Sequence, residues 1–156
     1  MASAGIELQI QEWERVKQGA CDFIEAMPDE HLGFRPVPGV LSFAGQFLHV
    51  ADANYLFASA ACGIDNPNQG QHSEEKPALQ SKEALLNFAT AGYDFVIGAL
   101  RNIEESALAD DVQFFKWTMP RHLVFAKALE HYAHHRGQTA VYFRLLGLKP
   151  PSERLF

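Results

Sequence analysis

The stretch PRHLVFAKALEHYAHHRGQTAVYFRLLG, residues 120–147, decides the fold. Its apolar residues recur every three or four positions, which is typical of a helix that buries one face. Thr118 is a candidate N-cap, Pro120 suits the first turn, and Gly147 suits the residue that ends a helix. The stretch therefore predicts a helix over residues 120–146. The buried stripe of this helix is predicted to hold Val124, Ala128, Tyr142 and Leu146.

Two histidines lie on this stripe. At about 100° per residue, His135 projects about 40° from His131, and apolar side chains surround both. His134 projects about 60° to the other side of His131, near Lys127 and Glu130, and is expected to face solvent. The i and i+4 spacing of His131 and His135 places two imidazoles one turn apart on one face, a spacing typical of metal ligands.

Three more helices are predicted upstream, over residues 6–27, 43–61 and 82–104. Each segment repeats apolar residues at helical spacing. Four long helices in a chain of 156 residues predict an all-α fold, a four-helix bundle formed by a single domain over residues 1–156. In such bundles, sites are built in the core by side chains of facing helices.

The connections are predicted from turn-forming residues. Ser42 and Ser81 stand where the N-caps of the second and third helices are expected. Residues 63–80 carry proline and glycine among polar residues, and this is the longest predicted loop. The aromatic segment from Val112 to Trp117 is predicted to be extended for a few residues.

A third histidine, His49, points inward on the predicted second helix. Three inward imidazoles each need partners for their nitrogens, and one shared metal ion satisfies one nitrogen of each ring. The pattern alone leaves a second interpretation open, in which three separate core histidines bond to tyrosine, threonine or backbone groups. Asp52 lies one turn beyond His49. It could orient a ligand or accept a proton, but a solvated carboxylate on the helix surface is the favoured interpretation. The remaining histidines are expected at the surface: His31, His72 and His122.

Composition excludes several classes of function. Thirteen Lys and Arg against nineteen Asp and Glu give a net charge of −6, which disfavours nucleic acid as a partner. No apolar run approaches the roughly 20 residues of a membrane span, and the N-terminus lacks the pattern of a signal peptide. We therefore expect a cytoplasmic protein without membrane contact, in which Cys21 and Cys62 are reduced, buried thiols.

Motifs in both halves of the chain resemble the DinB-like family. In the C-terminal half these are HYAHHRGQ at 131–138, RLLG at 144–147 and KPP at 149–151. In the N-terminal half they are FRPVPG at 34–39 and LHV at 48–50. The resemblance covers nearly the whole chain.

The resemblance implies a bundle with up-down-down-up topology, often dimeric, and a divalent metal ion bound by three histidines of the second and fourth helices. Carried over to this sequence, the ligands are His49, His131 and His135, the three residues already selected by their helix faces. Zinc is the favoured ion, with nickel, iron and copper as alternatives. Gln138 shares the His131 face and is expected to orient an imidazole, while Arg136 is expected to pair with a carboxylate.

Some family members are metal-dependent transferases that use low-molecular-weight thiols such as bacillithiol or mycothiol. The predicted function is accordingly a metal-dependent enzyme of the thiol S-transferase type acting on a small molecule, with hydrolysis as a variant. Three neutral ligands leave a coordination position open for water or substrate, which is typical of catalytic sites. The alternative is a non-catalytic metal-binding bundle that acts in dimerisation or in partner binding.

Overall fold

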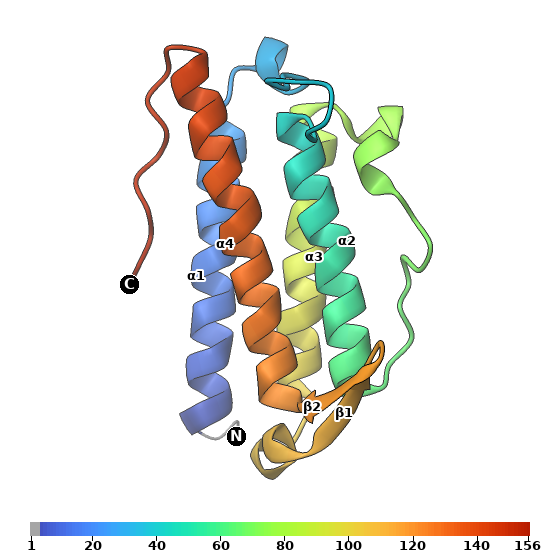
Figure 1. The fold of residues 1–156 in the computed structure, drawn as a ribbon. Helices are drawn as coiled ribbons and strands as arrows, with labels where there is room; N and C mark the ends of the chain where they lie inside the picture. The colour runs from blue at the N-terminus through green and yellow to red at the C-terminus, as the bar shows by residue number, and fades with distance from the viewer. Residues whose placement is uncertain (1–3) are drawn as a thin grey trace.

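A computed structural model describes residues 4–156. Within them the chain forms four α-helices, α1 (Ala4–Ala26), α2 (Phe43–Cys62), α3 (Lys82–Arg101) and α4 (Arg121–Leu145). The prediction of a four-helix bundle is confirmed, with helix ends displaced by at most a few residues. Figure 1 shows α1 and α4 running upward and α2 and α3 running downward, which is the up-down-down-up arrangement.

The caps of α2 and α3 form as predicted. Ser42 precedes α2, and its Oγ accepts a hydrogen bond from the backbone N–H of Gly45 at 3.0 Å. Ser81 precedes α3 and accepts in the same way from Ala84 at 3.3 Å. Gly63 ends α2 in the left-handed conformation, with φ of 63°, which a glycine adopts without steric cost.

A β-hairpin precedes α4 where the sequence predicted a short extended segment. Strand β1 (Asp111–Phe114) pairs antiparallel with β2 (Trp117–Pro120), so that Phe114 lies opposite Trp117. The prediction that Thr118 is the N-cap of this helix is wrong. Thr118 belongs to β2, and its Oγ1 donates to the Gln113 side chain at 3.0 Å. The fourth helix therefore begins only after the hairpin.

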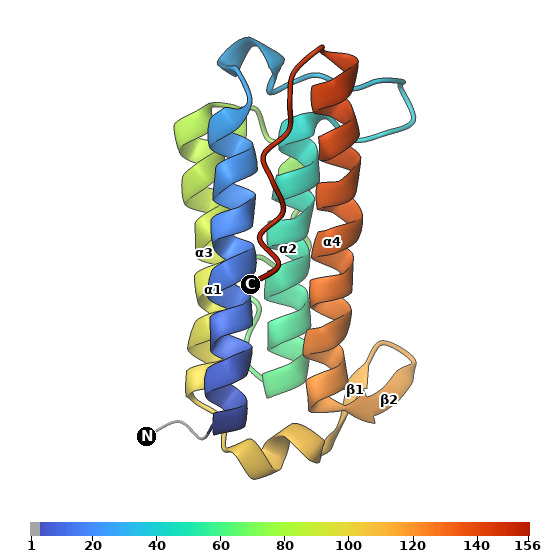
Figure 2. The same ribbon diagram turned by 90° about the vertical axis from the view of Figure 1, so that its left-hand side faces the viewer.

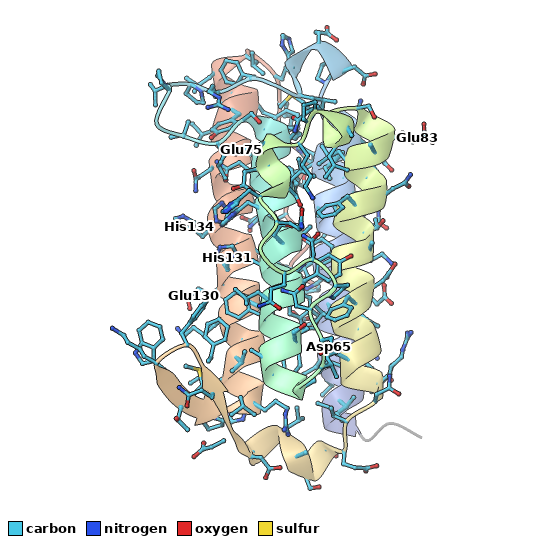
Figure 3. The ribbon with its side chains drawn as sticks, turned by 90° about the vertical axis from the view of Figure 1, so that its right-hand side faces the viewer. Asp65, Glu75, Glu83, Glu130, His131 and His134 are labelled. Carbon is cyan, nitrogen blue, oxygen red and sulfur yellow. The ribbon has the colours of Figure 1, made fainter. Side chains whose placement is uncertain are left out.

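The long segment between α2 and α3 returns the chain to the top of the bundle. Figure 3 shows it rising from Asp65 to Glu75 along the outside of α2 and α3. Asp52 fixes it, since its carboxylate accepts from the backbone N–H of Ser73 at 2.8 Å, from the Ser73 hydroxyl at 2.7 Å and from the Asn68 amide. The expectation of a solvated Asp52 is therefore wrong.

Helix α2 packs against both α3 and α4, and α1 packs mainly against α3. The C-terminal residues 148–156 run down between α1 and α4 (Figure 2). Two ion pairs hold this tail, Arg136 to Glu153 at 3.1 Å and Arg154 to Asp22. The expected carboxylate partner of Arg136 is thus in the tail. The largest core side chains include Trp13, Phe23, Phe43, Tyr93, Phe125 and Phe143.

The cysteines and the helix hydropathy test two further expectations, on thiol burial and on membrane contact. Cys21 and Cys62 are free thiols, as expected, but each is only half-buried. Desolvation raises the pKa of both thiols. Among residues 4–156, no helix combines the length and the apolarity that crossing a bilayer requires.

Candidate metal centre

Three histidines from two helices meet near the middle of the bundle. His49 comes from α2, and His131 and His135 come from successive turns of α4. One ring nitrogen of each lies within 4.8 Å of the corresponding nitrogens of the other two. The ring centroid of His49 is 5.1 Å from that of His131 and 4.7 Å from that of His135. The structure therefore brings together the three residues selected from the sequence.

The spacing of the nitrogens fits a shared ion. The Nε2 atoms of His131 and His135 are 3.1 Å apart. Two nitrogens bound at about 2.0–2.1 Å to one tetrahedral zinc ion lie about 3.3 Å from each other. All three side chains are partly buried, so the donor set is three imidazoles in a site that water and small ligands can reach.

A hydrogen-bond chain fixes the tautomer of His135. The Tyr142 hydroxyl donates to the backbone carbonyl of Leu41 at 2.8 Å, so its oxygen is left to accept from Gln46 Nε2 at 2.9 Å. This places Gln46 Oε1 at 2.5 Å from Nδ1 of His135. Since an amide oxygen only accepts, His135 carries its proton on Nδ1 and presents the Nε2 lone pair to the other histidines.

Gln46 is the functional residue that the sequence analysis missed. It is 1 % exposed on α2, one helical turn before His49. A polar residue three positions from an inward histidine, in a mostly apolar helix, was the available signal. Its contact with His135 depends on the packing of α2 against α4. The spacing of residues along one helix gives no information about that packing.

Gln138 orients an imidazole, as expected, but that of His134 rather than one of the three clustered histidines. Its Oε1 accepts from Gln46 Nε2 at 3.1 Å, and its own Nε2 donates to Nε2 of His134 at 3.1 Å. Gln138 therefore orients His134, the exposed neighbour of the site. In Figure 3, His134 follows Glu130 and His131 along α4, with Glu130 nearest the hairpin.

The other three histidines are not part of the cluster, although His72 lines a cavity that also reaches His49 and His131. His72 is exposed and His31 is partly buried. His122 is exposed at the start of α4, and its Nδ1 lies 3.0 Å from the carbonyl oxygen of Leu108. The expectation of surface positions holds for His72 and His122, whereas His31 is more enclosed.

Burial keeps the imidazoles of His131 and His135 neutral. Desolvation by burial, helped by His49 and His134, lowers the pKa of His131 to about 4. Desolvation lowers the pKa of His135 to about 3, with smaller contributions from His131, His49 and His134. At neutral pH both rings are therefore unprotonated, which is the form that binds metal ions.

Comparison with known proteins identifies the family of the chain. Residues 1–154 match the DinB family. The chain belongs to this family. No curated protein matches the sequence significantly.

Solved structures that are similar to this DinB-family chain share its fold. A DinB-like protein from Bacillus cereus ATCC 10987 is 22% identical, with a TM-score of 0.79 over 94% of this chain and 95% of that chain. A DinB-like protein from Bacillus subtilis is 18% identical, with a TM-score of 0.73 over 94% and 97%. A conserved protein from Enterococcus faecalis is also 18% identical, with a TM-score of 0.71 over 92% and 96%.

Two cavities of the DinB-family bundle lead to His131. The first, here the loop cavity, has a volume of about 490 Å³ between α2 and the segment that Asp52 holds. Its lining includes His49 and His131, and its polar members include Asn66, Asn68, Gln69, Gln71 and Glu74. The second, here the hairpin cavity, has a volume of about 580 Å³. Its lining is Phe57, Phe114, Trp117, Met119, Lys127, Glu130, His131 and His134.

Proposed function

We propose that this DinB-family chain is a divalent-metal-dependent enzyme that transfers groups to or from a low-molecular-weight thiol. His49, His131 and His135 are the proposed ligands. The observation that carries the proposal is the convergence of their ring nitrogens, with 3.1 Å between two Nε2 atoms. Both cavities reach His131, so the ligand cluster stands where small molecules can enter, as a catalytic site requires.

The donor set fits a metal ion that accepts a further ligand. All three donors are neutral, so a bound divalent ion keeps its full positive charge and favours an anion at the open position. When bound, such an ion supplies Lewis acidity that holds a thiol as thiolate, or lowers the pKa of a water molecule to about 7. Zinc is the proposed ion, and imidazole ligands also suit nickel, iron and copper.

The residues of the chain have defined parts in this proposal. Gln46 holds His135 in the tautomer that offers Nε2 to the ion. Asp52 holds the segment that forms the outer wall of the loop cavity. The amide side chains of that wall offer donors and acceptors to a polar, peptide-like thiol. These groups support the proposal that the thiol binds in the loop cavity.

Metal analysis followed by thiol titration tests the proposal. Purified protein is expected to hold one divalent ion per chain, and the cobalt-substituted protein is expected to develop a sulfur-to-cobalt charge-transfer band when a small thiol is added. Absence of a bound ion would refute the proposal. A bound ion that exchanges neither thiol nor azide would instead support the non-catalytic metal-binding bundle.

We also propose that the protein is a homodimer, as the family resemblance implies. Light scattering coupled to size-exclusion chromatography measures the mass directly. A mass of twice 17.4 kDa is expected.

A further inference from the structure

The hairpin cavity differs chemically from the loop cavity. The two share His131, Phe57 and Phe114 and lie on either side of these residues. Both cavities carry aromatic rings, but the loop cavity adds the amide side chains of Asn66, Asn68, Gln69 and Gln71, whereas the hairpin cavity has no amide side chain among its described lining residues and adds Trp117 and Met119. Two cavities with different side chains that meet at the same histidine are suited to two different small molecules.

Aromatic rings form the wall of the hairpin cavity. Phe57 of α2 and Phe114 of β1 stack with centroids 4.8 Å apart and planes inclined by 17°. The Phe57 ring also lies 6.0 Å from that of His131, so the stack ends at the metal centre. Opposite Phe114 in the hairpin, Trp117 is 53% exposed although it is among the most apolar and largest side chains. Lys116 Nζ lies over the indole, 5.0 Å from its centroid, and the rest of the exposed indole surface is available to a ligand in the cavity.

The charges of this cavity cancel. Its lining contains one cation and one carboxylate, and Lys127 Nζ lies 2.7 Å from an oxygen of Glu130. The paired groups leave little net charge within the lining, and an anion would have to compete with Glu130 for Lys127. Lys116 lies outside the lining and contacts the Trp117 ring instead. A cavity of about 580 Å³ is within the ordinary range for small-molecule sites.

We infer that the hairpin cavity binds an uncharged aromatic small molecule, packed against Trp117 and the Phe57–Phe114 stack with one end at His131. This inference rests on the proposed function, in which it supplies the second substrate beside the polar thiol of the loop cavity. The binding itself does not require the metal ion, because its contacts are with apolar side chains. The inference can therefore be tested separately from metal binding.

The experiment uses N-phenyl-1-naphthylamine, an uncharged dye whose fluorescence rises in apolar surroundings. The wild-type protein is expected to bind it saturably with one site per chain. Trp117→Ala is expected to raise the Kd by about tenfold or more, as loss of a large aromatic contact does. Phe156→Ala is the control, since Phe156 is an exposed aromatic that lines neither cavity. It is expected to leave the Kd within about twofold.

A second variant keeps the hairpin intact. Glu130→Gln removes the partner of Lys127 and gives the cavity a positive charge. It is expected to tighten binding of 8-anilino-1-naphthalenesulfonate, the sulfonated analogue of the dye, by about threefold, and to leave the uncharged dye unaffected. Unchanged binding of the anionic dye in this variant would place the ligand elsewhere and overturn the inference.

His49→Ala separates the two hypotheses. His49 lines only the loop cavity, so this variant is expected to lose metal and to keep the affinity for the uncharged dye. Dye binding by a wild-type protein that holds no metal would refute the proposed function and support this inference. Absence of saturable dye binding, equal weakening by Phe156→Ala and Trp117→Ala, or loss of dye binding in His49→Ala would overturn the inference.

Discussion

Adjacent histidines on α4 have different surroundings, and this difference gives a test of the metal ligands. His135 faces His49 and His131, whereas His134 is exposed and contacts Gln138. We predict that alanine at position 49, 131 or 135 greatly lowers metal content, because two ligands hold an ion far more weakly than three. His134→Ala is expected to retain the wild-type content.

The measurement is metal stoichiometry of the four purified variants after dialysis against a mild chelator. Circular dichroism of each variant controls for folding. Loss of metal from His134→Ala together with its retention in His135→Ala would reverse the assignment of ligands.

The amide of Gln46 gives a second prediction at this scale. Gln46→Met preserves the length of the side chain but removes the acceptor for His135 Nδ1. We predict that metal affinity falls by about 10–100-fold, the usual effect of losing a hydrogen bond that orients a ligand. Competition with a chromophoric chelator measures the affinity.

Gln138→Met is the matched control for Gln46→Met. It removes a neighbouring amide that contacts Gln46 and His134 but no proposed ligand. Its metal affinity is expected to stay within about twofold of wild type. Equal weakening in both variants would show that the whole network, rather than the bond to His135, sets the affinity.

Two glycines of α3 test how closely the helices pack. A Cβ atom at Gly92 would lie 3.1 Å from the Cα of Ala51, which is backbone of α2. At Gly98 it would meet nothing within 4 Å among the described residues. We predict that Gly98→Ala raises the free energy of unfolding by about 0.5–1 kcal/mol through helix propensity. Gly92→Ala is expected to lower it by about 1 kcal/mol, because overpacking outweighs the same gain.

Urea denaturation of both variants measures the difference. If Gly92→Ala raised the free energy of unfolding as much as Gly98→Ala, α2 and α3 could move apart at position 92 without loss of stability. In that case the approach of the two helices at Ala51 would not limit the residue at position 92.

At the scale of elements, the sequence predicts what one segment determines by itself. Each long helix buries a single stripe and so repeats apolar residues at helical spacing, and Ser42 and Ser81 cap the turns that follow them. Thr118 was assigned wrongly because strands of four residues are too short to show a period, and their pairing competes with the helix start. Asp52 was likewise misassigned because its partners, Ser73 and Asn68, are distant in sequence and follow an irregular path.

The same distinction between local and long-range information holds for the candidate site. The histidines were identifiable because each lies on the inward face of its own helix. Their mutual distances, the part of Gln46 and the two cavities arise from packing between elements, and residue spacing within one helix carries no information on them.

At the scale of the whole molecule, charge predicts how the protein behaves toward DNA. The chain has a net charge of −6 and no run of Lys or Arg. We predict no appreciable binding to duplex DNA at physiological salt, because such binding depends on cationic contacts with phosphates. An electrophoretic mobility assay at low-micromolar protein measures it. A retarded duplex whose retardation disappears on addition of salt would contradict the prediction.

The two helices that carry the histidines are separated in the chain by all of α3 and by the hairpin. During synthesis, the ribosome adds His131 about 80 residues after His49, which at about 5–20 residues per second is a delay of roughly 4–16 s. Throughout that interval the nascent chain offers only one of the three proposed ligands, His49, which by itself holds a divalent ion only weakly. We therefore expect metal to be acquired after translation has passed α4, so that loading depends on the ion pool that the completed chain meets.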